Sequence, residues 1–151
     1  MTYMSDNCQQ TVKFGGIGRM LMDGTLMKAC YQNKNSSSTG YIGLTPNNPG
    51  NIIPVNLDAM GGAIKAKQDA FVGAFDPSCR IKLTILKAAG MVGCCCADVP
   101  FFMQEISAKG WVFLGAHGTI MQKELKAGEE IVVDGASFVA CSVTVQCDAV
   151  A

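Results

Sequence analysis

The sequence lacks the features that would mark it as a membrane, secreted or nucleic-acid-binding protein. Its longest apolar runs are about five to seven residues, far short of the roughly 20 that a membrane-spanning helix requires. Its first ten residues are polar and include Asp6, and no Arg precedes Arg19, so neither a secretory signal nor a transit peptide is expected. Twelve Lys and Arg balance twelve Asp and Glu, which argues against strong non-specific binding to nucleic acid. Together these absences predict a soluble, cytoplasmic protein.

The chain also has no long segment with the 3.6-residue period of an amphipathic helix, so helix content should be low. It contains 49% hydrophobic residues and only 16% charged ones, a composition too apolar for a disordered chain. Seventeen glycines and five prolines separate short segments rich in Val, Ile, Phe and Thr. Many short strands joined by turns give this pattern, so the fold class predicted here is all-β.

The segments expected to form strands share apolar, β-branched or aromatic residues and end at turn-forming ones. They are residues 11–14, 19–22, 25–31, 40–44, 51–56, 63–67, 70–75, 81–86, 91–95, 101–107, 111–116, 119–125, 130–134 and 137–146.

Eight cysteines are a high number for 151 residues. Three of them, Cys94 to Cys96, are consecutive, and adjacent residues of a strand point to opposite faces, so the triplet suits a disulfide framework badly. Others, such as Cys141, lie within apolar segments, where a free thiol behaves as a small hydrophobic group. We therefore expect reduced, structural thiols in a reducing compartment.

An internal repeat is the most informative pattern in the chain. The two copies share apolar and glycine positions at one constant separation: Gly61 with Gly128, Ile64 with Ile131, Phe71 with Phe138, Val72 with Val139, and Gly73 with Ala140. A weaker third copy begins near Thr11. Each unit is predicted to hold three strands, the last two joined by a hairpin turn at Gln68-Asp69 or Asp134-Gly135. Such units would bury their apolar faces by packing into a β-sandwich or a closed double-stranded β-helix.

Several of these runs resemble a known family. They are Thr45-Pro-Asn-Asn-Pro-Gly-Asn-Ile-Ile-Pro-Val, Gln68-Asp-Ala-Phe-Val-Gly, Trp111-Val-Phe-Leu-Gly-Ala-His-Gly-Thr-Ile and Lys123-Glu-Leu-Lys-Ala-Gly-Glu-Glu-Ile-Val-Val-Asp-Gly-Ala-Ser-Phe-Val-Ala. The resemblance is to the altered inheritance of mitochondria protein 24 family, whose domain is similar to the tryptophan RNA-binding attenuation protein (TRAP). It spans roughly residues 11–146 and implies a TRAP-like double-stranded β-helix with internal repeats that often forms oligomers. Because mitochondrial members are linked to inner-membrane organisation, it also implies mitochondria as an alternative location.

The expected organisation is a single TRAP-like all-β domain over residues 11–147. Short tails of residues 1–10 and 148–151 flank it. No membrane span is expected in any of the three parts.

The residue types that carry catalysis or bind metals occur without a supporting motif. Cys94 to Cys96, with His117 or Asp98, could offer soft ligands to zinc or copper, but structural zinc sites use paired cysteines from two places. The competing interpretation is that these cysteines replace glycine in a tightly packed strand. His117 is the single histidine and lies in a predicted turn, without an evident nucleophile beside it. We assign no catalytic, cofactor-binding or metal residues, no cofactor and no enzymatic activity.

Oligomerisation is the function that the composition favours most. Zero net charge and nine methionines suit symmetric association, and Phe101-Phe102-Met103 would place bulky side chains on both faces of one strand. We therefore expect a non-catalytic scaffold or assembly protein that acts as a homo-oligomer, with its protein partner unknown. The alternatives are a ligand- or metal-binding sensor that uses Cys94 to Cys96, and an RNA-binding ring.

Nucleic-acid binding is the weaker alternative, because aromatic residues make up only 7% of the chain and base stacking needs them. The lysines that could form one basic face are Lys65, Lys67, Lys82 and Lys87. The simpler interpretation, which we favour, is that they form the ordinary polar side of half-buried strands.

Overall fold

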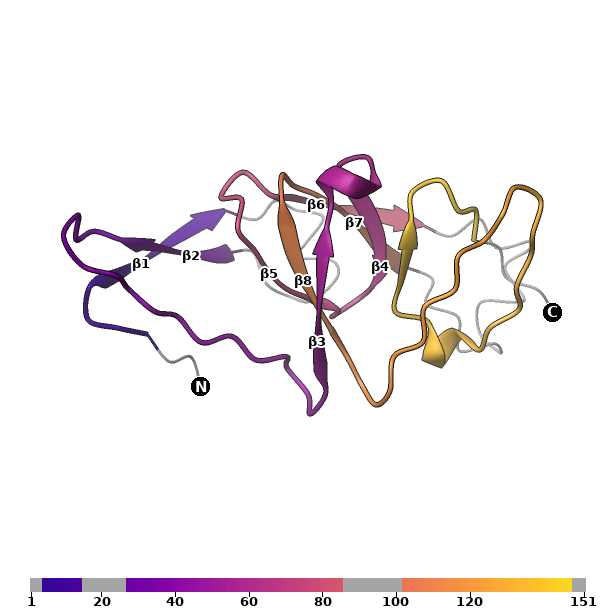
Figure 1. The fold of residues 1–151 in the computed structure, drawn as a ribbon, viewed down its shortest axis with the longest axis horizontal. Coiled ribbons are helices and arrows are strands. Elements are labelled where there is room, and N and C mark those ends of the chain that lie inside the picture. Colours follow the sequence, from indigo (N-terminus) through magenta and orange to yellow (C-terminus); the bar gives the residue numbers. More distant parts are fainter. Residues whose placement is uncertain (1–3, 15–26, 86–101, 148–151) are drawn as a thin grey trace.

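The computed structural model describes residues 4–14, 27–85 and 102–147. This part of the chain folds as nine β-strands with two short 3-10 turns, and it contains no α-helix (Figure 1). The strands are β1 (Cys8–Phe14), β2 (Met27–Asn33), β3 (Asn51–Asn56), β4 (Ala63–Lys67), β5 (Phe71–Ala74), β6 (Arg80–Ile85), β7 (Phe102–Ser107), β8 (Trp111–Ala116) and β9 (Ala140–Ser142); the turns are η1 (Asp58–Met60) and η2 (Gly135–Ser137). The all-β prediction is confirmed.

The strands form three sheets in which all neighbours are antiparallel. One sheet has the order β3-β8-β5, a second has the order β6-β7-β4-β9, and β1 pairs with β2 in a separate two-stranded sheet. The β1-β2 sheet extends to one side of the other two (Figure 1). Lys28 on β2 links this sheet to the others. Its ammonium group donates a hydrogen bond of 2.6 Å to the carbonyl of Cys79, the residue directly before β6.

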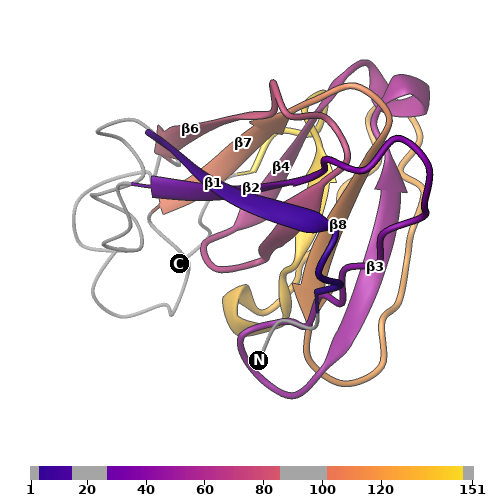
Figure 2. The same ribbon diagram turned by 90° about the vertical axis from the view of Figure 1, so that its left-hand side faces the viewer.

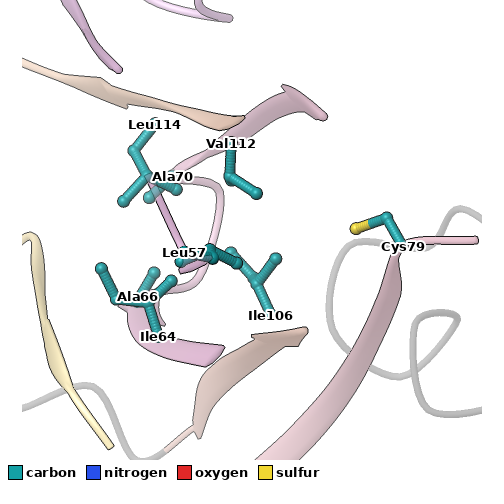
Figure 3. Close-up of a cluster of buried hydrophobic side chains, with 8 residues drawn as sticks. All are labelled: Leu57, Ile64, Ala66, Ala70, Cys79, Ile106, Val112 and Leu114. Atoms are coloured by element: carbon teal, nitrogen blue, oxygen red, sulfur yellow. The ribbon is translucent and has the colours of Figure 1, made fainter. Parts of the chain in front are cut away.

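The main core lies between the two larger sheets, which pack against each other (Figure 2). Alternate residues of β4 and β8 face this core, as the period of a half-buried strand dictates. Leu57 lies between the sheets, and its side chain is fully buried (Figure 3). The cluster drawn there consists of Leu57, Ile64, Ala66, Ala70, Cys79, Ile106, Val112 and Leu114.

Strands β4 and β5 are consecutive in the chain but belong to different sheets. The turn at Gln68 and Asp69 therefore carries the chain from one sheet to the other, and the predicted hairpin at this place is wrong. Asp69 adopts a left-handed conformation with φ 67°, and Ala70 is buried directly after it. The physical reason is that a crossing lets both strands turn apolar side chains toward one core, whereas a hairpin would extend a single sheet.

Six of the predicted strands are confirmed closely. β3, β4 and β8 match the expected residues 51–56, 63–67 and 111–116, β5 is one residue shorter than expected at each end, and β6 begins one residue earlier than expected. β7 matches the expected strand from Phe102, where the described residues resume, to Ser107. β1 begins three residues earlier than expected, at Cys8. The expected strands at residues 19–22 and 91–95 lie outside the described residues. The division into tails and one domain stays a prediction.

The remaining predicted strands are either wrong or much longer than what forms. Residues 119–125 and 130–134 form no strand, residues 40–44 contribute a single bridge from Ile42 to Met4, and residues 137–146 give only η2 and the short β9. A strand needs a partner for its backbone groups as well as an alternating pattern, and β4 pairs on this side only with residues 140–142. Residues 123–129 form a turn instead, which is closed by an ion pair of 2.6 Å between Lys123 and Glu129.

The second copy of the predicted repeat therefore lacks the structure of the first. Phe71 lies on β5 opposite Leu114 and packs against the core, whereas Phe138 follows η2 outside any strand. Asp134 begins η2 by accepting a hydrogen bond from the backbone of Ala136, so the hairpin predicted there is wrong. One equivalence holds: Gly61 and Gly128 both adopt left-handed conformations, with φ 80° and 79°.

The carboxylate of Asp76 joins the loop after β5 to the turn between β7 and β8. It accepts hydrogen bonds from the backbone and hydroxyl of Ser78, at 2.8 and 2.7 Å, and from the backbone of Lys109 at 2.9 Å. These bonds, chiefly that from the Ser78 hydroxyl, lower the pKa of Asp76 from 3.8 to about 2. The ionised carboxylate is thus favoured in the folded state.

A depressed pKa in the folded state predicts acid sensitivity. The stabilisation by Asp76 is fully present above pH 3.8 and is lost as the pH falls from there through about 2. We expect Asp76→Asn to lower the thermal unfolding midpoint at pH 6 and to lessen its fall between pH 4 and pH 2. The measurement is thermal unfolding followed by circular dichroism across this pH range. Asp58→Asn, at an exposed carboxylate on η1, is the control, and equal pH profiles for wild type and Asp76→Asn would contradict the assignment.

Candidate assembly surface

The three strands of the β3-β8-β5 sheet contain no charged residue. Their sequences are Asn-Ile-Ile-Pro-Val-Asn, Trp-Val-Phe-Leu-Gly-Ala and Phe-Val-Gly-Ala. On β8, Val112 and Leu114 are buried toward the core, so Trp111 and Phe113 lie on the opposite, outer face of the sheet. Large apolar side chains therefore lie on both faces of this sheet, and neither face carries a charge from these strands.

Three aromatic side chains form the centre of the outer face, which we call the aromatic face and define by Phe75, Trp111 and Phe113. The rings of Phe75 and Phe113 meet edge to face, with centroids 4.9 Å apart and an interplanar angle of 65°. The backbone of Phe75 donates a hydrogen bond to the carbonyl of Trp111, which continues the β5-β8 pairing. Phe75 is 71% exposed and Trp111 43%, although folding normally buries such large apolar side chains.

The segment before β3 borders this face. A side chain at Gly115 would lie 2.9 Å from Cβ of Pro46, and one at Gly73 would lie 3.3 Å from Cδ1 of Leu44. These two glycines therefore let the segment approach the sheet closely. Leu44 itself stays partly exposed and adds to the apolar surface.

The outer face of the other large sheet is charged. In the strand register, Glu105 on β7 lies between Lys65 on β4 and Lys82 on β6. The ammonium groups of Lys65 and Lys67 also donate hydrogen bonds to the carbonyls of Val145 and Ala136. The proposed basic face is thus interrupted by a carboxylate and partly used within the chain; Lys87, its fourth member, lies outside the described residues.

The residues considered for metal binding are not brought together in the described structure. Cys94 to Cys96 and Asp98 lie outside it. His117 is exposed after β8, with its Nδ1 2.9 Å from the carbonyl oxygen of Pro49. Within residues 4–14, 27–85 and 102–147, no group of three or more His, Cys, Asp or Glu side chains is placed to hold a metal ion.

The apolar surface expected at Phe101 to Met103 differs from the one observed. Met103 is buried within the molecule, and Phe101 lies outside the described residues. Sequence reasoning missed the aromatic face because Phe75, Phe113 and Trp111 were each assigned to ordinary half-buried strands. The signal that could have found it is the absence of charge from all three strands of one sheet.

Fold and surface together define an all-β protein with one uncharged, aromatic sheet face. The family model described as mitochondrial biogenesis AIM24 matches residues 1–151, so the chain belongs to this family, and the resemblance noted from its motifs is confirmed. Membership implies a role related to mitochondrial biogenesis and an association with mitochondria. No curated protein gives a significant match to the chain. Among the described residues, no helix has the length and apolar character needed to span a membrane.

Proposed function

We propose that this AIM24 family member is a non-catalytic assembly protein that acts through homo-oligomerisation of its aromatic face. The observation that carries the proposal is the exposure of Phe75 and Trp111 on a sheet whose three strands lack charge. Burying such a surface against another protein releases roughly 25 cal/mol for each Å² of apolar area. Exposed apolar patches of this kind mark interaction sites.

The occupant we propose is a second copy of the same chain. Two copies of an uncharged face meet without electrostatic repulsion, and the zero net charge of the chain adds none at longer range. A nucleic acid or a charged membrane surface would find no complementary charge on these three strands.

The edges of the sheet favour contact through the face rather than by strand addition. On β3, the exposed Pro54 lacks an N–H group, and on β5 a bulge between Phe71 and Gly73 interrupts the register. Proline and bulges are devices by which edge strands resist pairing with other chains. Association through side chains of the face is therefore the geometry that remains.

The proposal extends to the finer architecture that the family resemblance implies, a TRAP-like double-stranded β-helix. Its support is that two sheets share one core and that Gly61 and Gly128 adopt the same left-handed conformation at matching positions.

The test uses Trp111, which is the only tryptophan of the chain and lies in the proposed contact. We expect the wild-type protein to be oligomeric at micromolar concentrations in size-exclusion chromatography with light scattering, and Trp111→Lys to be monomeric. In the wild type, dilution should shift the tryptophan emission to longer wavelength as the indole becomes exposed to water.

The matched control is Val132→Lys, which adds the same charge at an exposed apolar position away from the aromatic face. It should leave the oligomer mass unchanged. A monomeric wild-type protein, or a Trp111→Lys variant with unchanged mass, would overturn the proposal. Circular dichroism of both variants checks that the fold survives the substitution.

A further inference from the structure

Two cysteines near the end of the described chain lie with their sulfur atoms in contact. Cys141 on β9 and Cys147, six residues later, have their Sγ atoms 3.5 Å apart. Both are free thiols, and both side chains are half-buried. The step from this contact to a covalent bond of about 2.05 Å is a movement of less than 2 Å, which side-chain rotation can supply.

The backbone between the two cysteines is held in a turn that keeps the sulfur atoms together. The N–H of Val145 donates to the carbonyl of Ser142 at 3.1 Å, and the hydroxyls of Ser142 and Thr144 lie 2.9 Å apart. Lys65, which lies opposite Cys141 in the register of β4 and β9, donates from Nζ to the carbonyl of Val145 at 3.1 Å. Several contacts therefore hold the backbone in the conformation that brings the two cysteines together.

We propose that Cys141 and Cys147 are a dithiol–disulfide couple, a redox-sensitive site that ties residue 147 to the edge strand β9 when it is oxidised. The site is independent of the aromatic face, since it lies at the edge of the other large sheet. Oxidation would add a covalent loop beside the three-residue pairing of β9 with β4, which is the shortest strand pairing of the β6-β7-β4-β9 sheet.

The reaction balances with a small-molecule disulfide such as oxidised glutathione as the oxidant. The Cys147 thiolate attacks one sulfur of glutathione disulfide, forms a mixed disulfide and expels one glutathione thiolate. Cys141 then loses its proton to water and attacks Sγ of Cys147, and the second glutathione thiolate leaves. Two protein thiols are oxidised to one disulfide while one glutathione disulfide is reduced to two glutathiones.

The order of the two steps follows from the environment of Cys141. Burial, followed by the neighbouring Cys147, raises the pKa of the Cys141 thiol to about 12, although the charge of Lys65 acts in the opposite direction. Cys141 is therefore protonated near neutral pH and is a poor first nucleophile. This assigns the first attack to Cys147 and the closing step to Cys141.

Trypsin separates this couple from the other cysteines. No Lys or Arg follows Lys126, so residues 127–151 form one peptide that contains Cys141 and Cys147, whereas Cys8, Cys30 and Cys79 each fall in a peptide of their own. The full-length protein is incubated with glutathione disulfide, quenched with acid, unfolded, alkylated with N-ethylmaleimide and digested. Mass spectrometry then gives the state of each cysteine separately.

We expect the peptide of residues 127–151 to take up no N-ethylmaleimide. Its mass should be about 2 Da, the mass of two hydrogens, below that of the reduced peptide without label. We compare the glutathione disulfide concentrations that oxidise half of this pair and that modify half of Cys30. The concentration for the pair should be at least about tenfold lower, because the second thiol is held within reach of the first. Cys141→Ser should stop at the mixed disulfide of Cys147 with glutathione. Cys30→Ser, the matched control, should leave loop closure unchanged.

Three results would overturn the proposal. The first is that both cysteines of the peptide of residues 127–151 are still alkylated at a glutathione disulfide concentration that modifies Cys30. The second is a wild-type protein that stops at the mixed disulfide. The third is a disulfide-linked dimer through either cysteine on a non-reducing gel. The wild-type measurement alone decides each case, so the proposal stays testable even if a serine variant fails to fold.

Discussion

Leu57→Ala should lower the free energy of unfolding by about 2–5 kcal/mol, the usual range for truncation of a fully buried leucine. The side chain of Leu57 is 0% exposed and lies in the cluster between the two large sheets (Figure 3). Its backbone also fixes the turn that follows β3, because its carbonyl accepts hydrogen bonds from the N–H groups of Met60 and Gly62. The truncated site cannot collapse freely while that turn holds the main chain in place.

Chemical unfolding with urea, followed by circular dichroism, measures this effect. Val132→Ala is the control, because the same kind of truncation at a side chain that is 87% exposed should change stability by less than about 0.5 kcal/mol. Similar losses in the two variants would show that Leu57 is not the centre of the core described here.

Gly50→Ala should also be strongly destabilising, for a steric reason. A Cβ atom at Gly50 would lie 2.3 Å from the carbonyl oxygen and 3.0 Å from the carbonyl carbon of Ala116, both backbone atoms of β8. The strands β3 and β8 would have to separate at Asn51 and Ala116, the first pair of their register. We expect a loss of about 1–3 kcal/mol, typical of forced overpacking.

Gly73→Ala is the matched control for this prediction. Its added Cβ would meet Cδ1 of Leu44 at 3.3 Å, and that atom ends a flexible, partly exposed side chain that can move aside. Neither glycine has a positive φ, so backbone strain does not separate the two variants. Urea unfolding of both should give the larger loss for Gly50→Ala, and the reverse order would contradict the close approach of β3 and β8.

The sequence predicted individual strands better than their pairing. Residues 63–67 and 111–116 alternate apolar and polar or aromatic positions, and this local pattern defined β4 and β8 to the residue. The β-branched run at residues 130–134 also predicted a strand, but none forms there, because a strand requires a partner, and partners are set by contacts between distant parts of the chain. The repeat misled for the same reason: similar residues at Phe71 and Phe138 do not give similar neighbours.

The sequence predicted that the protein associates with itself, but it did not predict which surface does so. Zero net charge and the surplus of apolar residues indicated self-association, but the surface was assigned to Phe101 to Met103. The aromatic face is created by the pairing of β8 with both β3 and β5, which sets Trp111 and Phe113 beside Phe75. No local pattern in the sequence contains that adjacency. The contact of Cys141 with Cys147 likewise depends on a turn that the sequence did not reveal.

The arrangement of the β3-β8-β5 sheet has a consequence for synthesis of the chain. The middle strand β8 is translated after both of the strands that it joins. Until residue 116 has left the ribosome, β3 and β5 have no central strand between them, and their apolar side chains face solvent or other nascent chains. Sheets that depend on such distant pairings form slowly. This protein should therefore rely on chaperones during translation more than a hairpin-built domain of equal length does.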